Sequence, residues 1–350
     1  MTLARARLGG VRLLALAVGC AGLLGLASAI SAPSAAAVLG EKLFFDKSLS
    51  ADGSISCATC HRPDRAFADG RPVAEGIRGA SGTRNTPSLL NVGDHDVLLW
   101  DGRRETLESQ VLEPLANPLE HGLSSAAQVV SKLRGNESYR ALFESSFGRG
   151  QIELSDIAAA LATYVRSLGG GLSRFDRYWS LGDKTALNET ERYGLEVFRG
   201  PGQCASCHVI DGARAKFTDD KFHSLGVGHA KLSKGLAEST RKVVGLATGT
   251  RELAITADAG IAALGRFNVS LRPSDIGKYR TPSLRNVGVT GPYMHDGSVT
   301  TLEEAVDREL YYRSASMDRP LILTPGERAS VVAFLRSLTS TRIESSQADR

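Results

Sequence analysis

The chain has 350 residues, which is enough to form one or two hydrophobic cores. Hydrophobic residues make up 42% of it and charged residues 23%, a composition that is typical of a globular protein and excludes a disordered or fibrous one. The formal net charge is +4, but three arginines lie in the acid-free residues 1–30, and without them the charge is +1. No Lys/Arg cluster occurs elsewhere, so the charge argues against nucleic-acid binding.

The N-terminus predicts a secretory signal. Arginines come first, an apolar run follows from Leu13 to Leu26, and Ala27-Ser28-Ala29 offers a small-residue cleavage site. We therefore expect residues 1–29 to be removed and the protein to act in the periplasm. Cys20 lies inside the apolar run, so a lipid anchor and an uncleaved membrane anchor are the less favoured alternatives.

A five-residue motif follows the first predicted helix, in which Leu39 and Leu43 share a face. Residues 57–61 read Cys-Ala-Thr-Cys-His. Two cysteines separated by two residues and followed by histidine form the attachment site of a c-type haem. The cysteines bond the porphyrin as thioethers and the histidine binds the iron. The motif assigns a covalent haem to Cys57, Cys60 and His61.

Loops and then helices are predicted between the first motif and residue 187. Residues 62–99 are rich in Gly, Pro, Asn and Asp, which indicates irregular structure. Hydrophobic periodicity and capping residues then predict helices, and a glycine run after the last one predicts a linker. The helices are expected over residues 105–115, 124–133 and 156–168, and the linker over 169–187.

The motif recurs as Cys-Ala-Ser-Cys-His at residues 204–208, after a helix predicted over 191–198. Two copies in a chain with five cysteines are a strong signal for two haems. A four-cysteine zinc site or a redox dithiol pair is the alternative, but neither needs a histidine after each cysteine pair. The second haem is assigned to Cys204, Cys207 and His208. With Cys20 in the signal, no disulfide is expected.

An internal repeat relates two halves of the chain. Residues 84–92 (RNTPSLLNV) match residues 279–287 (YRTPSLRNV), and Trp100-Asp101-Gly102 matches His295-Asp296-Gly297. The second half carries about 50 extra residues, roughly 209–258. Because strand patterns are scarce, we predict a mainly α fold with little β. It would comprise two c-type cytochrome domains, residues 36–180 and 181–342.

These motifs resemble those of the bacterial dihaem cytochrome c peroxidase and MauG superfamily, from about Gly40 to Leu338. The resemblance implies that the N-terminal haem meets peroxide, that the C-terminal haem passes electrons to it, and that a calcium ion lies between the domains. By position it implies an inter-haem tryptophan, a distal acid–base glutamate, a distal glutamine and proline, and three calcium ligands. These residues are, in that order, Trp100, Glu120, Gln110, Pro114, and Asn85, Thr290 and Pro292.

Two positions depart from the superfamily pattern. Its peroxidases carry a distal histidine shortly before the RNxP segment, but residues 74–78 contain none. The resemblance therefore implies a five-coordinate or water-bound first haem, as in MauG. The Met or Tyr that is the sixth ligand of the second haem falls here on Glu309. A two-residue shift along one helix would bring Tyr311 to the iron, with Tyr312 and Met317 as alternatives.

The residues themselves favour catalysis at the first haem. No methionine lies between Met1 and Met294, so the first half lacks the commonest sixth ligand of an electron-carrying cytochrome. In the acid–base role that the resemblance implies, Glu120 would take a proton from peroxide and return it to the leaving oxygen. His121 is the alternative base or iron ligand.

The leading hypothesis is a periplasmic peroxidase that reduces hydrogen peroxide to water with electrons from a small donor, a cytochrome c or a cupredoxin. One alternative is a MauG-like oxidase that modifies Trp or Tyr of a partner protein. Another is a non-enzymatic dihaem electron carrier. Analogy with the superfamily also suggests a homodimer.

Overall fold

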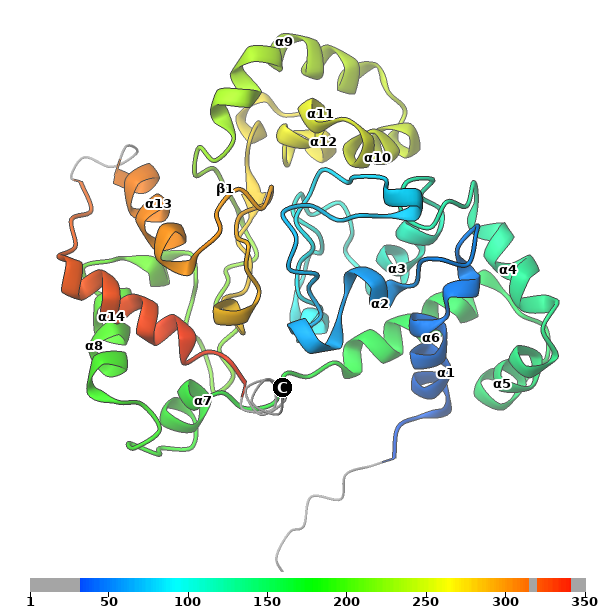
Figure 1. Cartoon of the computed structure of the whole chain (residues 1–350), viewed down its shortest axis with the longest axis horizontal. Helices are drawn as coiled ribbons and strands as arrows, with labels where there is room; N and C mark the ends of the chain where they lie inside the picture. Colours follow the sequence, from blue (N-terminus) through cyan, green and yellow to red (C-terminus); the bar gives the residue numbers. More distant parts are fainter. Residues whose placement is uncertain (1–31, 315–319, 341–350) are drawn as a thin grey trace, which may run out of the picture. The chain divides into compact units, whose positions relative to one another are not determined.

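The computed structural model describes residues 32–314 and 320–340. The predicted signal and Met317 lie outside these residues. Within them, none of the helices combines the length and the apolar character needed to cross a membrane. The described part confirms the mainly α prediction, because it contains fourteen α-helices and a single two-stranded sheet (Figure 1).

The elements follow one another in a regular order along the chain. The helices up to the second haem motif are α1 (Ala35–Phe45), α2 (Cys57–Cys60), α3 (Leu107–Leu115), α4 (Ala126–Arg134), α5 (Glu137–Phe147), α6 (Leu154–Ser167), α7 (Arg174–Trp179) and α8 (Glu189–Arg199). After it come β1 (Phe222–His223), α9 (His229–Gly245), α10 (Thr248–Ala257), α11 (Ala259–Ala263), α12 (Phe267–Ser270), β2 (Tyr279–Arg280), α13 (Leu302–Ser314) and α14 (Pro325–Arg336). The antiparallel strands pair Phe222 with Arg280 and His223 with Tyr279.

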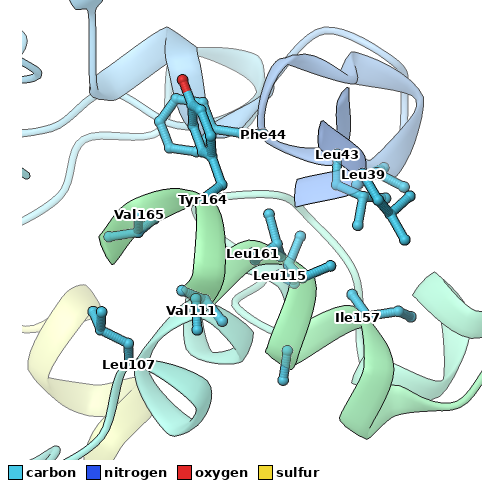
Figure 2. Packing of buried hydrophobic residues seen from close by; sticks show 14 of the residues in the cluster. Leu39, Leu43, Phe44, Leu107, Val111, Leu115, Ile157, Leu161, Tyr164 and Val165 are labelled. Carbon is cyan, nitrogen blue, oxygen red and sulfur yellow. The ribbon is translucent and has the colours of Figure 1, made fainter. Parts of the chain in front are cut away.

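Helix α1 packs on α6 and so holds the chain that leads into the first haem motif (Figure 2). The apolar face of α1 meets the buried stripe of α6, with α3 completing the cluster. Gly40 makes the close approach possible, because a Cβ added there would lie 2.0 Å from the Ala160 carbonyl oxygen. The labelled members of the cluster are Leu39, Leu43, Phe44, Leu107, Val111, Leu115, Ile157, Leu161, Tyr164 and Val165.

The second half repeats this helix pair with α8 and α14, which lie side by side in Figure 1. Here Gly194 allows the close approach of the two helices, as Gly40 does in the first half, because an added Cβ would lie 1.9 Å from the Ser330 carbonyl oxygen. Each glycine is followed by apolar residues at the third and fourth positions, Leu43 and Phe44 in α1 and Val197 and Phe198 in α8. This shared pattern extends the repeat beyond the motifs that the sequence first shows.

The loops after the two motifs also repeat their hydrogen bonds. Ser88 Oγ donates to the Ala66 carbonyl at 2.5 Å, and the matching Ser283 Oγ donates to the Lys216 carbonyl at 2.7 Å. In the same way, the backbone N–H groups of Asn91 and Asn286 donate to Leu168 and Leu338, at the ends of the closing helices. The repeated sequence thus fixes a repeated backbone path around each motif.

Two segments differ from the sequence-based expectation. The expected linker 169–187 contains α7, which Ser173 and Asp176 cap and which buries Phe175 completely. The extra residues of the second half form the helices α9 to α12, which extend to Ser270 and have a small core of their own. That core consists of Leu232, Val243, Ile255, Ile261, Leu264 and Phe267.

Candidate haem and peroxide site

A cavity of about 430 Å³ holds both haem motifs in its wall; we call it the motif cavity. Its volume lies within the range of small-molecule and cofactor pockets. The motif residues that line it are Cys57, Cys60, His61, Cys204 and His208. All four described cysteines are free thiols, and they do not gather into one four-cysteine zinc cluster in the described part of the chain.

The two motif histidines are prepared for iron in the same way. His61 Nδ1 donates to the Phe67 carbonyl at 2.9 Å, and His208 Nδ1 donates to the Phe217 carbonyl at 3.0 Å. This bond fixes the tautomer and leaves Nε2 as the ligating atom, as in other metal-binding histidines. Burial lowers the pKa of both imidazoles, that of His208 to about 4, so they are neutral near pH 7. The residues fit a haem at each motif.

The cysteine thiols are held in an apolar setting. Burial raises the pKa of Cys57, Cys60 and Cys204 to about 12, so these thiols stay protonated until thioether bonds replace them. Cys207 differs, because a hydrogen bond with His223 lowers its pKa. Cys207, His223 and Asp219 hold ligand atoms within 4.8 Å of one another, but a thioether at Cys207 would remove the thiolate from that cluster.

Trp100 lines the motif cavity and is bonded to both halves of the chain. Its Nε1 donates to the Asn85 carbonyl at 2.9 Å, and its own carbonyl accepts the Arg280 backbone N–H at 2.8 Å. The Asn85 N–H in turn donates to the His295 carbonyl at 2.9 Å. The structure therefore places Trp100 where backbone from the first half meets backbone from the second.

The residues that the resemblance assigns to the distal pocket come together at one end of α3. Gln110 and Pro114 are four residues apart and both line the motif cavity, as does Glu120 in the loop that follows. Pro114 lacks a backbone N–H, and α3 ends one residue later, at Leu115. The chain then turns back and presents Glu120 to the same space.

Glu120 is a half-buried carboxyl in a polar setting that the sequence did not reveal. Asn117 Nδ2 bridges Glu120 Oε1 at 3.1 Å and Thr256 Oγ1 of α10 at 3.0 Å. Burial and then the negative charge of Glu113 raise the pKa of Glu120 to about 7, against a smaller opposite effect of Arg103. A carboxyl that titrates near neutral pH can both accept and return a proton.

An ion-pair network contains Arg103 and Glu113, the two charged residues that shift the pKa of Glu120. Arg103 binds Asp101 at 2.8 Å and Glu113 at 2.6 Å, while Arg104 binds Glu252 of α10 at 2.6 Å. The Arg103 and Asp101 side chains are largely removed from solvent, and each stays charged because it is paired with the other. The network joins α3 to the extra helices of the second half.

His121 is next to Glu120 but is held differently. Its Nδ1 donates to the Pro114 carbonyl at 3.1 Å. Its Nε2 has no hydrogen-bond partner and almost no accessible surface, although other atoms of the residue line the motif cavity. Because an iron ligand must be open to the metal, this conformation favours Glu120 over His121 as the group that acts in the cavity.

The structure does not bring either tyrosine to the motif cavity. Tyr311 is 71% exposed, and Tyr312 packs against it and against Gly226. Glu309 lines the cavity instead. The residues assigned to calcium, Asn85, Thr290 and Pro292, all line the cavity, and Asn85 is buried.

Known proteins are similar to this chain in sequence and in fold. A family model described as di-haem cytochrome c peroxidase matches residues 34–185. The chain is 33% identical over 312 residues to the methylamine utilization protein MauG of Methylophilus methylotrophus, covering 86% of this chain and 82% of that one. It is 31% identical over 310 residues to the cytochrome c551 peroxidase of Nitrosomonas europaea, covering 87% and 79%.

A solved structure is also similar to this chain. The crystal structure of a MauG-like protein associated with microbial copper homeostasis superposes with a TM-score of 0.70 at 32% identity, covering 92% of this chain and 97% of that one. These matches confirm the resemblance seen in the sequence, and with it two haem c groups and a peroxide-using oxidoreductase. The chain belongs to the dihaem cytochrome c peroxidase and MauG family.

Proposed function

We propose that the protein is a periplasmic peroxidase that reduces hydrogen peroxide to water at the haem held by Cys57, Cys60 and His61. Glu120 carries the proposal, because its carboxyl lines the motif cavity and has a pKa of about 7. Each turnover consumes one peroxide, two protons and two electrons and yields two waters. A carboxyl that titrates near neutral pH can be ionised there and so accept a proton.

The side chains of the pocket each have a part in this reaction. When bound, the haem supplies the iron at which peroxide binds and the electrons that cleave its O–O bond. Glu120 takes a proton from the bound peroxide and returns it to the leaving oxygen. Asn117 holds the Glu120 carboxylate at 3.1 Å, and Gln110 offers an amide to the same space. Pro114 closes the pocket without adding a backbone N–H donor.

Electrons would enter from an external donor, a cytochrome c or a cupredoxin, at the haem of Cys204, Cys207 and His208. Trp100 would carry them onward to the first haem, since a tryptophan between two redox centres can be oxidised transiently. Its hydrogen bonds to Asn85 and Arg280 support this route. The separate core clusters around α6 and around α14 support two haem domains, residues 36–180 and 181–342.

A calcium ion is the third proposed component. Asn85 Nδ2 donates to the carbonyls of Arg71 and Pro72, at 2.9 and 3.4 Å, so its Oδ1 is the side-chain atom left to accept or to ligate. Oxygen ligands of this kind suit calcium, and the carbonyls of Thr290 and Pro292 would add two more.

A MauG-like oxidation of Trp or Tyr on a partner protein is the second candidate function. The segment that holds the distal histidine in the superfamily's peroxidases contributes Ala74 and Gly76 to the cavity wall, neither of which can bind iron. An iron left open in the resting state suits both activities. The names of the relatives, peroxidase and MauG, favour an enzyme over a simple electron carrier.

Steady-state turnover of the holoprotein with peroxide and a reduced cytochrome c or cupredoxin tests the proposal. Glu120→Gln is expected to lower the rate by about 10²–10⁴-fold, the usual range for general acid–base groups. Glu105→Gln, which changes an exposed glutamate, is the matched control. Full turnover in Glu120→Gln, or none in the haem-loaded wild type, contradicts the peroxidase mechanism. Slow turnover of donors, together with oxidised Trp or Tyr on a partner, favours the second function.

A further inference from the structure

Helix α13 presents one face to the motif cavity. The residues of this face are Leu302, Ala305 and Glu309, spaced by three and four positions as on a single helical stripe. Thr301 fixes the start of the helix, because its Oγ1 accepts the backbone N–H of Glu304 at 3.1 Å. Two residues along an α-helix turn a side chain through about 200°. Tyr311 therefore points away from the face that carries Glu309, in agreement with its exposure.

Glu309 is held beside the second haem motif. Arg313, one turn further along α13, has its Nε 3.8 Å from Glu309 Oε1 and donates to the Gly202 carbonyl and to Ser206 Oγ, at 3.3 and 3.4 Å. Cys204 and Glu309 both line the motif cavity. The Glu309 side chain keeps 22% of its surface accessible, and the residue lines the cavity that His208 also lines.

Other side chains in the cavity wall could bind iron, but their backbone belongs elsewhere. Met294 and His295 line the cavity from a turn that Asn85 binds through its backbone N–H. The His295 ring also stacks on Tyr279, with ring centroids 3.7 Å apart. By contrast, α13 is tied directly to residues 202 and 206, next to the motif.

We propose that Glu309 faces the iron of the second haem opposite His208 and that its carboxylate is the sixth ligand of the ferric state. The inference rests on the haem attachment at Cys204, Cys207 and His208 that the proposed function also uses. A carboxylate is a hard, anionic ligand, whereas a methionine thioether is soft and neutral and raises the potential of a haem. Glu309 would therefore hold the second haem at a lower potential than a His/Met pair would.

The test uses the holoprotein, with mass spectrometry to confirm two covalent haems in every variant. Electron paramagnetic resonance and absorption spectra should show a changed spin state at one haem only in Glu309→Gln. Glu309→Met should produce the charge-transfer band of sulfur-ligated iron and a more positive potential for that haem. Glu303→Gln is the matched control, because this residue lies on the same helix but is 54% exposed and paired with Arg336.

The same spectra can overturn the inference. A Glu309→Gln spectrum identical to the wild type would refute it, as would a spin-state change in Met294→Leu or Tyr311→Phe with none in Glu309→Gln. Failure of the proposed function is separate. In that case, the loaded wild type would not turn over peroxide while the Glu309 variants still changed their spectra as expected.

Discussion

The protonation of Glu120 depends on a neighbouring carboxylate that can be removed without touching the cavity's catalytic groups. Glu113 accepts a hydrogen bond from Arg103 at 2.6 Å and lies 3.1 Å from Arg104 Nε. Burial and Glu113 together raise the pKa of Glu120 from 4.5 to about 7. That rise corresponds to about 3 kcal/mol against the ionised form.

Glu113→Gln removes the negative charge and leaves Arg103 less neutralised, and both changes favour ionised Glu120. We expect the pKa of Glu120 to fall by about one unit, because burial, the larger cause, is unchanged. The cost to the free energy of unfolding should be about 1–3 kcal/mol. It stays in that range because Arg103 keeps Asp101 and Arg104 keeps Glu252 as partners.

The assay is kcat/KM for peroxide as a function of pH, which reports the ionisation of the free enzyme. In the wild type, activity should rise through an apparent pKa near 7, and in Glu113→Gln the same rise should occur about one pH unit lower. Glu108→Gln, on the same helix and paired with the exposed Arg166, should leave the profile unchanged. An activity rise at the same pH in Glu113→Gln as in the wild type, or one that persists in Glu120→Gln, would contradict this role of Glu120.

Three further predictions concern other parts of the site. Trp100→Phe keeps an aromatic ring but removes the N–H that is bonded to Asn85. We expect it to slow electron transfer to the first haem at least about tenfold, with haem content unchanged. Single-turnover rates equal to those of the wild type would rule out the relay. Burial lowers the pKa of His121 from 6.5 to about 4, so stability is lost as pH falls below 6.5. Between pH 7 and 5 the wild type should lose about 2 kcal/mol more unfolding free energy than His121→Leu in urea titrations, and parallel losses would contradict this. Chelation by EGTA should lower the melting temperature reversibly in the wild type but not in Asn85→Leu, and a calorimetric titration without calcium binding would exclude the ion.

The features that depend only on local sequence pattern could be predicted from the sequence. The motif residues Cys57 to His61 and Cys204 to His208 need only their spacing, and α6 follows from an uninterrupted apolar period. Helix α7 escaped prediction because it has only six residues and follows three glycines, whose signal for a loop dominates. Its reason to fold is tertiary, since Phe175 is buried against the second core cluster.

The candidate site shows the same division. Trp100, Gln110, Pro114 and Glu120 could be placed by resemblance, and the structure brings them to one cavity. Their partners could not be found in this way, because Asn117 meets Thr256 across 139 positions of sequence. Tyr311 illustrates a different limit. A shift of two residues looks small in a sequence, but on a helix it reverses the direction of a side chain.

Helix α10 also has a consequence for the order in which the enzyme is assembled. Its Thr256 and Glu252 bind Asn117 and Arg104, and the Ile255 carbonyl accepts the Thr83 hydroxyl at 2.6 Å, so residues of the second half wall the pocket of the first haem. If the chain is secreted N-terminus first, as the proposed periplasmic location implies, the first motif would be exported before this wall exists. Its haem could then be attached while the distal side is still open. Helix α10 would close the pocket afterwards, so a protein truncated before α10 would carry haem without a finished active site.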